Sequence, residues 1–147
     1  MKKTVLFFIL CFSFLSNLQA QSEAPVSNLY KGTIDGKFPI ILYIKTQESP
    51  CTGELMFTSM YRYNKSNDWI QLRVTQNAKE NEFVLVEYGF SGVLILKKTK
   101  NAFTGIWISS DAKKQLTVDL KESKMTKKEL ENYEEIMENV NYQNNDC

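Results

Sequence analysis

The residues best able to do chemistry in this chain are carboxylates and aromatic side chains, because the sequence contains no histidine. Without histidine, Ser-His-Asp and Cys-His nucleophilic arrangements and histidine-ligated zinc sites are excluded. The cysteines are too few for a zinc site built from thiolates alone. No glycine-rich phosphate loop or calcium-loop spacing occurs either. We therefore expect no catalytic constellation, no metal site and no cofactor.

Glu87 is the carboxylate of most interest, because it shares a strand face with the apolar Phe83 and Leu85. If that face points inward, the buried charge needs compensation, and Arg73 and Lys97 are the candidate cations. The alternative is that Glu87 sits near a strand end and reaches solvent. Both interpretations stay open, with a functional acid/base role for this carboxylate as one of them.

A second candidate site is an aromatic-rich corner formed by Tyr61, Arg62 and Tyr63, with Trp69 across the next turn. Amphipathic aromatic residues beside an arginine have the composition of a protein-binding hot spot. At the mouth of a barrel, such residues also line small-molecule pockets. The alternative is that the two tyrosines close the end of the core while Arg62 faces water.

Eight short runs rich in β-branched and aromatic residues must position these side chains, and turn residues bound each run. The runs cover residues 29–34, 38–45, 53–63, 69–75, 83–88, 93–97, 103–108 and 116–120. Short links permit only antiparallel neighbours, and eight strands is about the number at which a twisted sheet closes. We predict a mainly β domain over 29–121: an eight-stranded antiparallel up-and-down meander closed into a barrel. A curled open sheet or a two-layer sandwich is the alternative.

One amphipathic helix is predicted after the strands, over residues 125–140. Thr126-Lys127-Lys128-Glu129 is a capping box, and Met125 and Leu130 stand where a hydrophobic staple would pack. We expect its apolar stripe to cover an apolar outer face or an open end of the barrel. Strands two, five and six are apolar on both faces, so they are candidates to lie under the helix. Residues 141–147 form a polar tail. The apolar positions at helical spacing are Leu130, Tyr133, Ile136, Met137 and Val140.

Residues 1–20 have the organisation of a secretory signal peptide. Lys2 and Lys3 precede an apolar run from Val5 to Leu15, and a short polar segment ends at Ala20. We expect cleavage after Ala20, an N-terminal extension over 21–28, and a bacterial protein that is periplasmic or secreted. No later segment is apolar enough to span a membrane.

The net charge of the mature chain limits the classes of partner that it could bind. The signal segment holds two of the 18 basic residues and none of the 17 acidic residues, so the mature net charge is about −1. This balance argues against nucleic acid as a partner, because nucleic-acid binding needs a basic face.

Two cysteines, Cys51 and Cys147, remain after cleavage, and in an oxidising compartment we expect them to form a disulfide. The alternative is two free thiols.

The predicted order of elements resembles that of small up-and-down barrels of the avidin and lipocalin kind. The local resemblance is the Thr-Gly-x-Trp strand Phe103-Thr104-Gly105-Ile106-Trp107. It implies that Gly105 lets a neighbouring group approach and that Trp107 plugs one end. In lipocalins the Gly-x-Trp lies in the first strand, whereas here it lies in the seventh. No polar residue that holds biotin in avidins can be matched, so biotin binding is not implied.

A second resemblance, to a recurrent group of small exported bacterial proteins, covers more of the mature chain. It implies export and the fold, and no chemistry. The matching segments are Tyr30-Lys31-Gly32-Thr33-Ile34, Pro39-Ile40, Gly53-Glu54-Leu55, Leu85-Val86-Glu87-Tyr88 and Phe103-Thr104-Gly105-Ile106-Trp107.

Two functional hypotheses follow, both non-catalytic. The first is an exported protein that recognises another protein through the aromatic corner, as an inhibitor, immunity-type factor or envelope adaptor. The second is a carrier of a small apolar or aromatic ligand inside the barrel. The interior volume discriminates between them: a filled interior favours surface recognition, and a pocket of several hundred cubic ångströms favours the carrier. The expected inward positions are Phe57, Leu72, Phe83, Leu85, Ile95, Trp107, Leu116 and Leu120.

Overall fold

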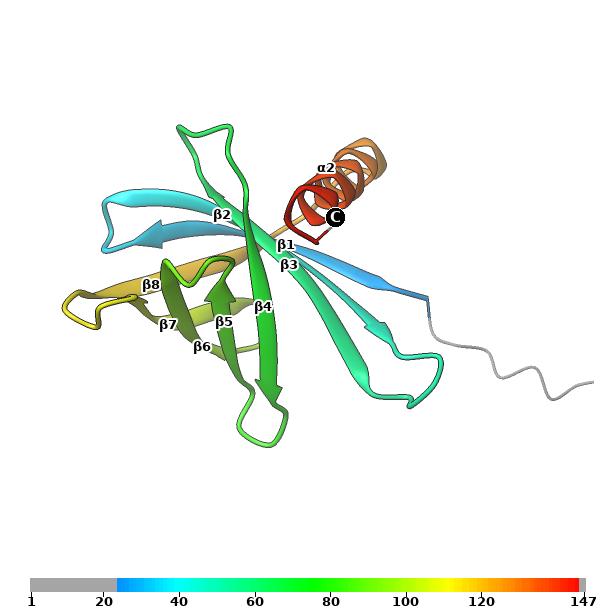
Figure 1. The fold of residues 1–147 in the computed structure, drawn as a ribbon, viewed down its shortest axis with the longest axis horizontal. Helices are drawn as coiled ribbons and strands as arrows, with labels where there is room; N and C mark the ends of the chain where they lie inside the picture. The colour runs from blue at the N-terminus through cyan, green and yellow to red at the C-terminus, as the bar shows by residue number, and fades with distance from the viewer. Residues whose placement is uncertain (1–23, 146–147) are drawn as a thin grey trace, which may run out of the picture.

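The computed structural model describes residues 24–145, which form eight β-strands followed by a long helix, α2 (Figure 1). The predicted signal peptide, residues 1–20, lies outside the described residues. The elements are β1 (Val26–Ile34), β2 (Phe38–Glu48), β3 (Leu55–Tyr63), β4 (Ile70–Asn77), β5 (Glu82–Glu87), β6 (Gly92–Lys98), β7 (Ala102–Ser109), β8 (Gln115–Ser123) and α2 (Lys127–Asn145).

The strands form a closed antiparallel barrel in sequence order, from β1 round to β8. Closure is made by pairing of β1 with β8, in a register that runs from Leu29 opposite Ser123 to Ile34 opposite Val118. The predicted up-and-down barrel is therefore confirmed, and the open sheet and the sandwich are not what forms. Every strand has a neighbour on both sides, but the β3–β4 pairing is short and runs only from Ser59 opposite Leu72 to Tyr61 opposite Ile70.

The first hairpin shows how local sequence sets the meander. Asp35 and Gly36 both have positive φ angles, 56° and 62°, as an Asp-Gly pair in a tight hairpin turn favours, and Lys37 completes the link because Ile34 pairs with Phe38. β2 is longer than predicted and continues to Glu48, because it pairs with β3 as far as Glu48 opposite Leu55. β1 begins at Val26, so part of the expected extension over 21–28 is strand.

Large apolar side chains fill the middle of the barrel, as the alternation of the strands predicts. The predicted inward position is wrong for Ile95, whose side chain is 40% exposed and points outward. The neighbouring Leu94 and Leu96 point inward instead, since side chains alternate between the faces of a strand. The fully enclosed members of the core are Tyr30, Ile34, Ile40, Leu42, Ile44, Tyr61, Leu72, Phe83, Leu85, Leu94, Leu96, Phe103, Val118 and Leu120.

The predicted capping box begins α2. The backbone N–H of Thr126 donates to Glu129 Oε2 at 2.8 Å, and the backbone N–H of Glu129 donates to Thr126 Oγ1 at 3.2 Å. Both Met125 and Leu130 pack against the cluster beneath the helix, as the staple predicts. The helix continues to Asn145, further than predicted, and the Gln71 side chain of β4 bonds to amides in its last turns.

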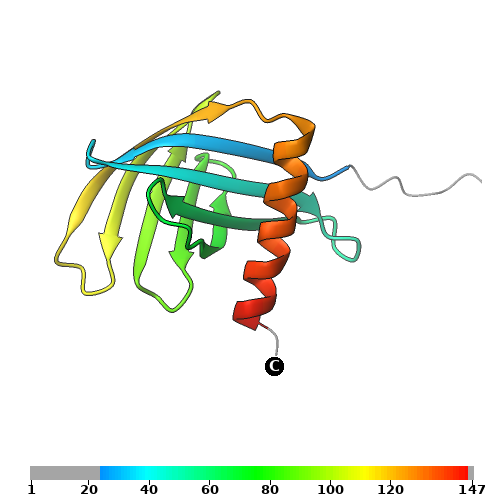
Figure 2. The ribbon, with the colours of Figure 1, turned by 90° about the horizontal axis from the view of Figure 1, so that it is seen from above.

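The helix crosses the outer face of β1, β2 and β3 (Figure 2). The helix therefore lies on an apolar outer face, as predicted, and of the candidate strands two, five and six it covers only β2. On the uncovered side, Val84 of β5 and Ile95 of β6 are 38% and 40% exposed. The side chains buried beneath and on the helix are Leu29, Ile41, Tyr43, Met60, Tyr133, Met137 and Val140.

Cys51 is exposed in the link between β2 and β3 and forms no disulfide with any of the described residues. Its expected partner, Cys147, lies outside the described residues. The pairing of Cys51 with Cys147 therefore stays a prediction.

Candidate functional site

The two ends of the barrel differ in construction. Because the strands run alternately up and down, the β3–β4 and β5–β6 turns lie at one end, and the β2–β3, β4–β5 and β6–β7 links lie at the other. The first end is closed by a hydrogen-bonded cluster around Glu87. The second end opens into a cavity.

Glu87 is 4% exposed and points into the barrel together with Phe83 and Leu85, so of the two interpretations left open by the sequence the inward one holds. Tyr61 Oη donates to Glu87 Oε1 at 2.5 Å, and Trp107 Nε1 donates to the same oxygen at 2.7 Å. The hydroxyl of Ser91, in the β5–β6 turn, donates to Glu87 Oε2 at 2.5 Å. One carboxylate thus ties together β3, the β5–β6 turn and β7.

Neither of the two candidate cations compensates the charge of Glu87. Among the described residues no salt bridge reaches Glu87, because Arg73 and Lys97 both lie on the outward face of their strands. The Arg73 guanidinium lies 5.9 Å from the ring centroid of Tyr88, and Lys97 stands opposite Glu82. Three neutral donors take the place of a cation, which is enough to satisfy the oxygens of a buried carboxylate.

Two features position the donors. Gly92 leaves room for the Trp107 indole, since a Cβ at residue 92 would stand 2.5 Å from Trp107 Nε1. Tyr63 packs edge-on against Tyr61, with ring centroids 5.7 Å apart.

Burial is the largest cause, and the hydrogen bond to Glu87 the next, that raises the pKa of Tyr61 far above its ordinary value. Tyr61 is therefore a neutral donor at any physiological pH.

The structure divides the predicted aromatic corner between two faces of β3. Tyr61 and Tyr63 lie inside the barrel, whereas Arg62 lies outside with its guanidinium 5.2 Å from the centroid of Trp69. Trp69 packs edge-on against Tyr133 of α2, with centroids 5.7 Å apart. The four residues therefore do not present one common surface.

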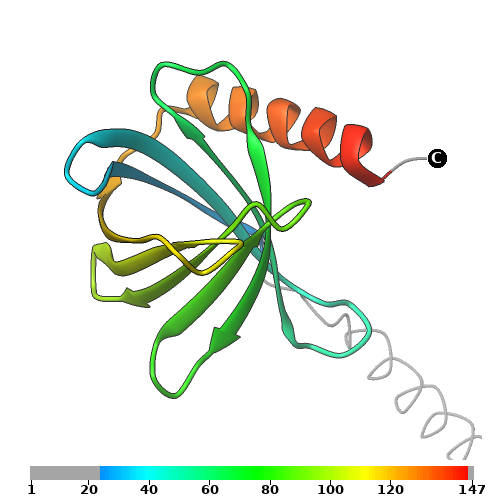
Figure 3. The same ribbon diagram turned by 60° about the vertical axis from the view of Figure 1, so that its left-hand side comes forward.

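Arg62 and Trp69 border a groove between the β3–β4 hairpin and α2, which lie side by side in Figure 3. Arg62 Nη1 donates to the Ser66 carbonyl oxygen at 2.8 Å, while its Nε is buried without a hydrogen-bond partner among the described residues. The helix supplies the side-chain amides of Asn132, Asn139 and Gln143 to the polar lining, and the hairpin supplies Asn67 and Asp68.

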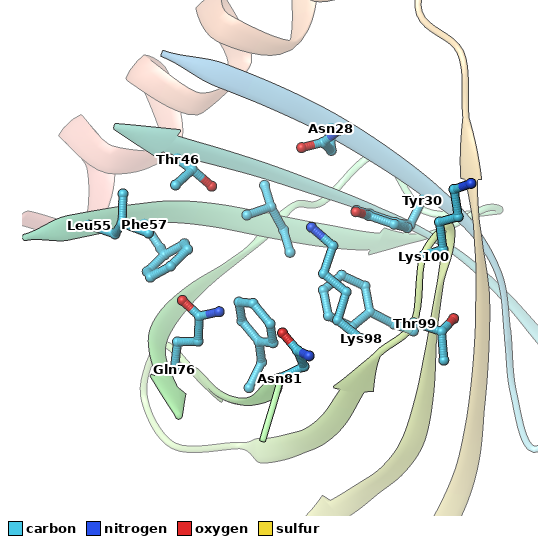
Figure 4. A pocket seen from close by; sticks show the side chains of 13 residues that line it. Asn28, Tyr30, Thr46, Leu55, Phe57, Gln76, Asn81, Lys98, Thr99 and Lys100 are labelled. Carbon is cyan, nitrogen blue, oxygen red and sulfur yellow. The ribbon is translucent and has the colours of Figure 1, made fainter. Parts of the chain in front are cut away.

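The open end of the barrel contains a cavity of about 500 Å³ (Figure 4). Its apolar side is a chain of edge-to-face aromatic rings: Tyr30 on Phe103 at 4.8 Å, Phe103 on Phe83 at 5.2 Å, and Phe83 on Phe57 at 5.7 Å between centroids. The polar lining is provided by Asn28, Thr46, Gln76, Asn81 and Thr99, together with the cations Lys98 and Lys100.

Sequence reasoning did not single out the residues of this cavity. Only Phe57 and Phe83 are among the predicted inward positions, and the polar lining residues lie at or beyond the ends of the predicted strands. A usable signal was the closed barrel itself, because inward positions at alternate strand ends must then converge on one mouth. Of the predicted site residues, Tyr61, Tyr63, Glu87 and Trp107 gather instead at the opposite end.

Comparison with known proteins finds no matching family model, no matching curated protein and no matching solved structure. Within residues 24–145 no group of three or more acidic or cysteine side chains could hold a metal ion. In the same part of the chain no helix has the length and apolar character needed to cross a membrane. The assignment of function therefore rests on the geometry of the barrel.

Proposed function

We propose that this protein is a non-catalytic binding protein that holds a small ligand with an apolar or aromatic body in the open end of its barrel. The observation that carries the proposal is the row of four aromatic rings beneath a cavity of about 500 Å³ with a polar rim. Apolar walls with a few convergent polar groups are the usual composition of a small-molecule site, and this volume is within the usual range.

The closed end supports the same function. Glu87 and its donors shut that end with satisfied hydrogen bonds, so a ligand would enter from the opposite side of the core, where the cavity opens. Their role is to hold the closed end of the barrel rather than to react. The Glu87 carboxylate is buried and already accepts three hydrogen bonds, which leaves it poorly placed to take a proton from a substrate.

Export remains part of the proposal. The first twenty residues predict that the mature protein acts outside the cytoplasm, in the periplasm or as a secreted bacterial protein. The resemblance of the mature chain to small exported bacterial proteins favours the same location. In such a compartment a carrier would take up its ligand from solution.

Protein recognition through the aromatic corner is supported less well by the geometry. Tyr61 is 1% exposed and Tyr63 faces the interior, so neither is placed for contact with a partner. A partner could reach only Arg62 and Trp69, and Trp69 already packs on the helix.

A neutral fluorescent probe, N-phenyl-1-naphthylamine, tests the proposed function. We expect its fluorescence to rise on binding the mature protein. The variant Gln76→Trp, which places an indole in the cavity, should give only a small part of that rise. Thr75→Trp is the matched control, because Thr75 is the neighbouring residue on the outward face of β4. An equal fluorescence rise in both variants, or no rise with the unmodified protein, would overturn the proposal.

A further inference from the structure

We propose that the ligand of the open-end cavity is an anion: a small aromatic or aliphatic carboxylic acid, whose carboxylate is held by Lys98 and Lys100 while its apolar body lies on the aromatic rings. This inference rests on the proposed function and specifies its class of ligand.

The charged side chains that line the cavity are all positive. Lys98 ends β6 and Lys100 follows in the turn to β7, and both line the cavity, whereas no acidic side chain among residues 24–145 lines it. Glu122 of β8 lies behind the lining and accepts a hydrogen bond at 3.1 Å from Nδ2 of Asn28, a lining residue. A cavity with cations and no carboxylate selects for a negative ligand.

Lys98 is placed to act on a ligand rather than on the protein. Its side chain is half-buried, and its Nζ lies 5.9 Å from the centroid of the Phe103 ring. No carboxylate among the described residues lies within salt-bridge distance of it. An aromatic ring compensates an ammonium only weakly, so a carboxylate at the mouth would gain a charge-assisted hydrogen bond from it.

Tyr30 adds a neutral donor deeper in the cavity. Its side chain is 1% exposed, and Figure 4 shows its hydroxyl end among the side chains that surround the cavity. Burial, with the nearby Glu122 as the smaller cause, raises the pKa of Tyr30 to about 12. The hydroxyl therefore keeps its proton at neutral pH and can donate to an acid group.

Three ligands that share one ring test the inference by isothermal titration at low ionic strength: 2-naphthoate, its neutral amide, and the naphthylmethylammonium cation. We expect naphthoate to bind about tenfold more tightly than the amide, and the cation most weakly. Raising the salt concentration should shrink this preference, because the lysines lie near solvent.

Two matched pairs of lysine substitutions test whether the cavity lysines cause the preference for naphthoate. The double variant Lys98→Gln/Lys100→Gln should lose the preference for naphthoate over the amide. The double variant Lys97→Gln/Lys121→Gln makes the same change in net charge on the outer surface and should keep it. Tyr30→Phe, which keeps the ring, should reduce the affinity for naphthoate severalfold.

The outcomes separate the two proposals. Equal binding of all three ligands overturns the anion inference and leaves the carrier function standing. If none of them binds, both proposals fail. A preference for naphthoate that survives Lys98→Gln/Lys100→Gln, or that is lost equally in Lys97→Gln/Lys121→Gln, overturns the role of the two cavity lysines.

Discussion

Glu87 shows how a buried carboxylate can be accommodated without an ion pair. Its two oxygens accept from a phenol, an indole and a serine hydroxyl, which come from three separate parts of the barrel. Hydrogen bonds to a charged group are worth more than neutral ones, and leaving a partner unsatisfied in the interior is costly. The cluster therefore contributes to the stability of the closed end only while all its members are present.

Tyr61→Phe tests this arrangement by removing one hydroxyl and keeping the ring. We expect the free energy of unfolding to fall by about 1–3 kcal/mol, because Glu87 loses a donor in a site that water does not reach. The measurement is urea denaturation of the two proteins. Tyr142→Phe is the control, since Tyr142 is 68% exposed on α2 and should have almost no effect. Equal unfolding midpoints for Tyr61→Phe and the unmodified protein would contradict the interpretation.

At the scale of elements, α2 is held at both ends by side-chain hydrogen bonds. The capping box fixes its start, and Gln71 with the Tyr88 hydroxyl, which donates to the carbonyl of Asn144, fixes its last turn. Between the ends, Lys45 of β2 pairs with Glu134 at 2.9 Å, while Tyr133 stacks on Tyr43 with centroids 5.6 Å apart. These contacts align the apolar stripe of the helix with β1–β3.

The capping box makes the start of the helix sensitive to acid. Hydrogen bonds from the Thr126 backbone N–H, and then from its hydroxyl, hold the pKa of Glu129 below its ordinary value. A lowered folded-state pKa means that this stabilisation is fully present above the ordinary pKa of glutamate and is lost as the pH falls through the folded-state pKa.

An NMR titration of the Glu129 carboxyl in the unmodified protein and in Thr126→Ala checks this expectation. The variant keeps the backbone donor and loses the hydroxyl, so the pKa of Glu129 should return part of the way toward its ordinary value. An unchanged titration curve would mean that the hydroxyl makes no contribution. Asp111, whose pKa is lowered by Ser109 and the Lys113 backbone, serves as an internal control that should not move.

At the scale of the whole molecule, the barrel closes only where strands can approach closely. A Cβ on Gly105 of β7 would stand 2.0 Å from the carbonyl oxygen of Ile95 in β6, and a Cβ on Gly32 of β1 would stand 2.0 Å from that of Asp119 in β8. These two glycines lie at the β6–β7 and β1–β8 pairings. The approach expected at Gly105 is therefore that of a neighbouring backbone.

Gly105→Ala should cost more than about 2 kcal/mol of unfolding free energy, or prevent folding, because the obstacle is backbone and cannot rotate away. Thr104→Ala, on the adjacent outward position of β7, is the control and should cost less than about 1 kcal/mol. Thermal unfolding followed by circular dichroism distinguishes the two. If both variants melt at the same temperature, the close approach at residue 105 is not what closes the barrel.

The features that the sequence alone determined are those made by neighbours along the chain. The Asp35–Gly36 turn, the alternation that turns Glu87 inward and the Thr126–Glu129 cap follow from local geometry, and all are present in the structure. The short links between strands and the number of strands, eight, were also enough to favour the barrel.

Tertiary structure decided what distant residues do together. Only closure brings Tyr61, Glu87 and Trp107 to one end and Lys98 to the rim of the other, because strand alternation gives the side of a residue and not its neighbours across the barrel. For the same reason the sequence could not say which strands the helix covers. β5 and β6 are apolar on both faces, yet α2 covers β1–β3, where the link from β8 and the contacts of Gln71 place it.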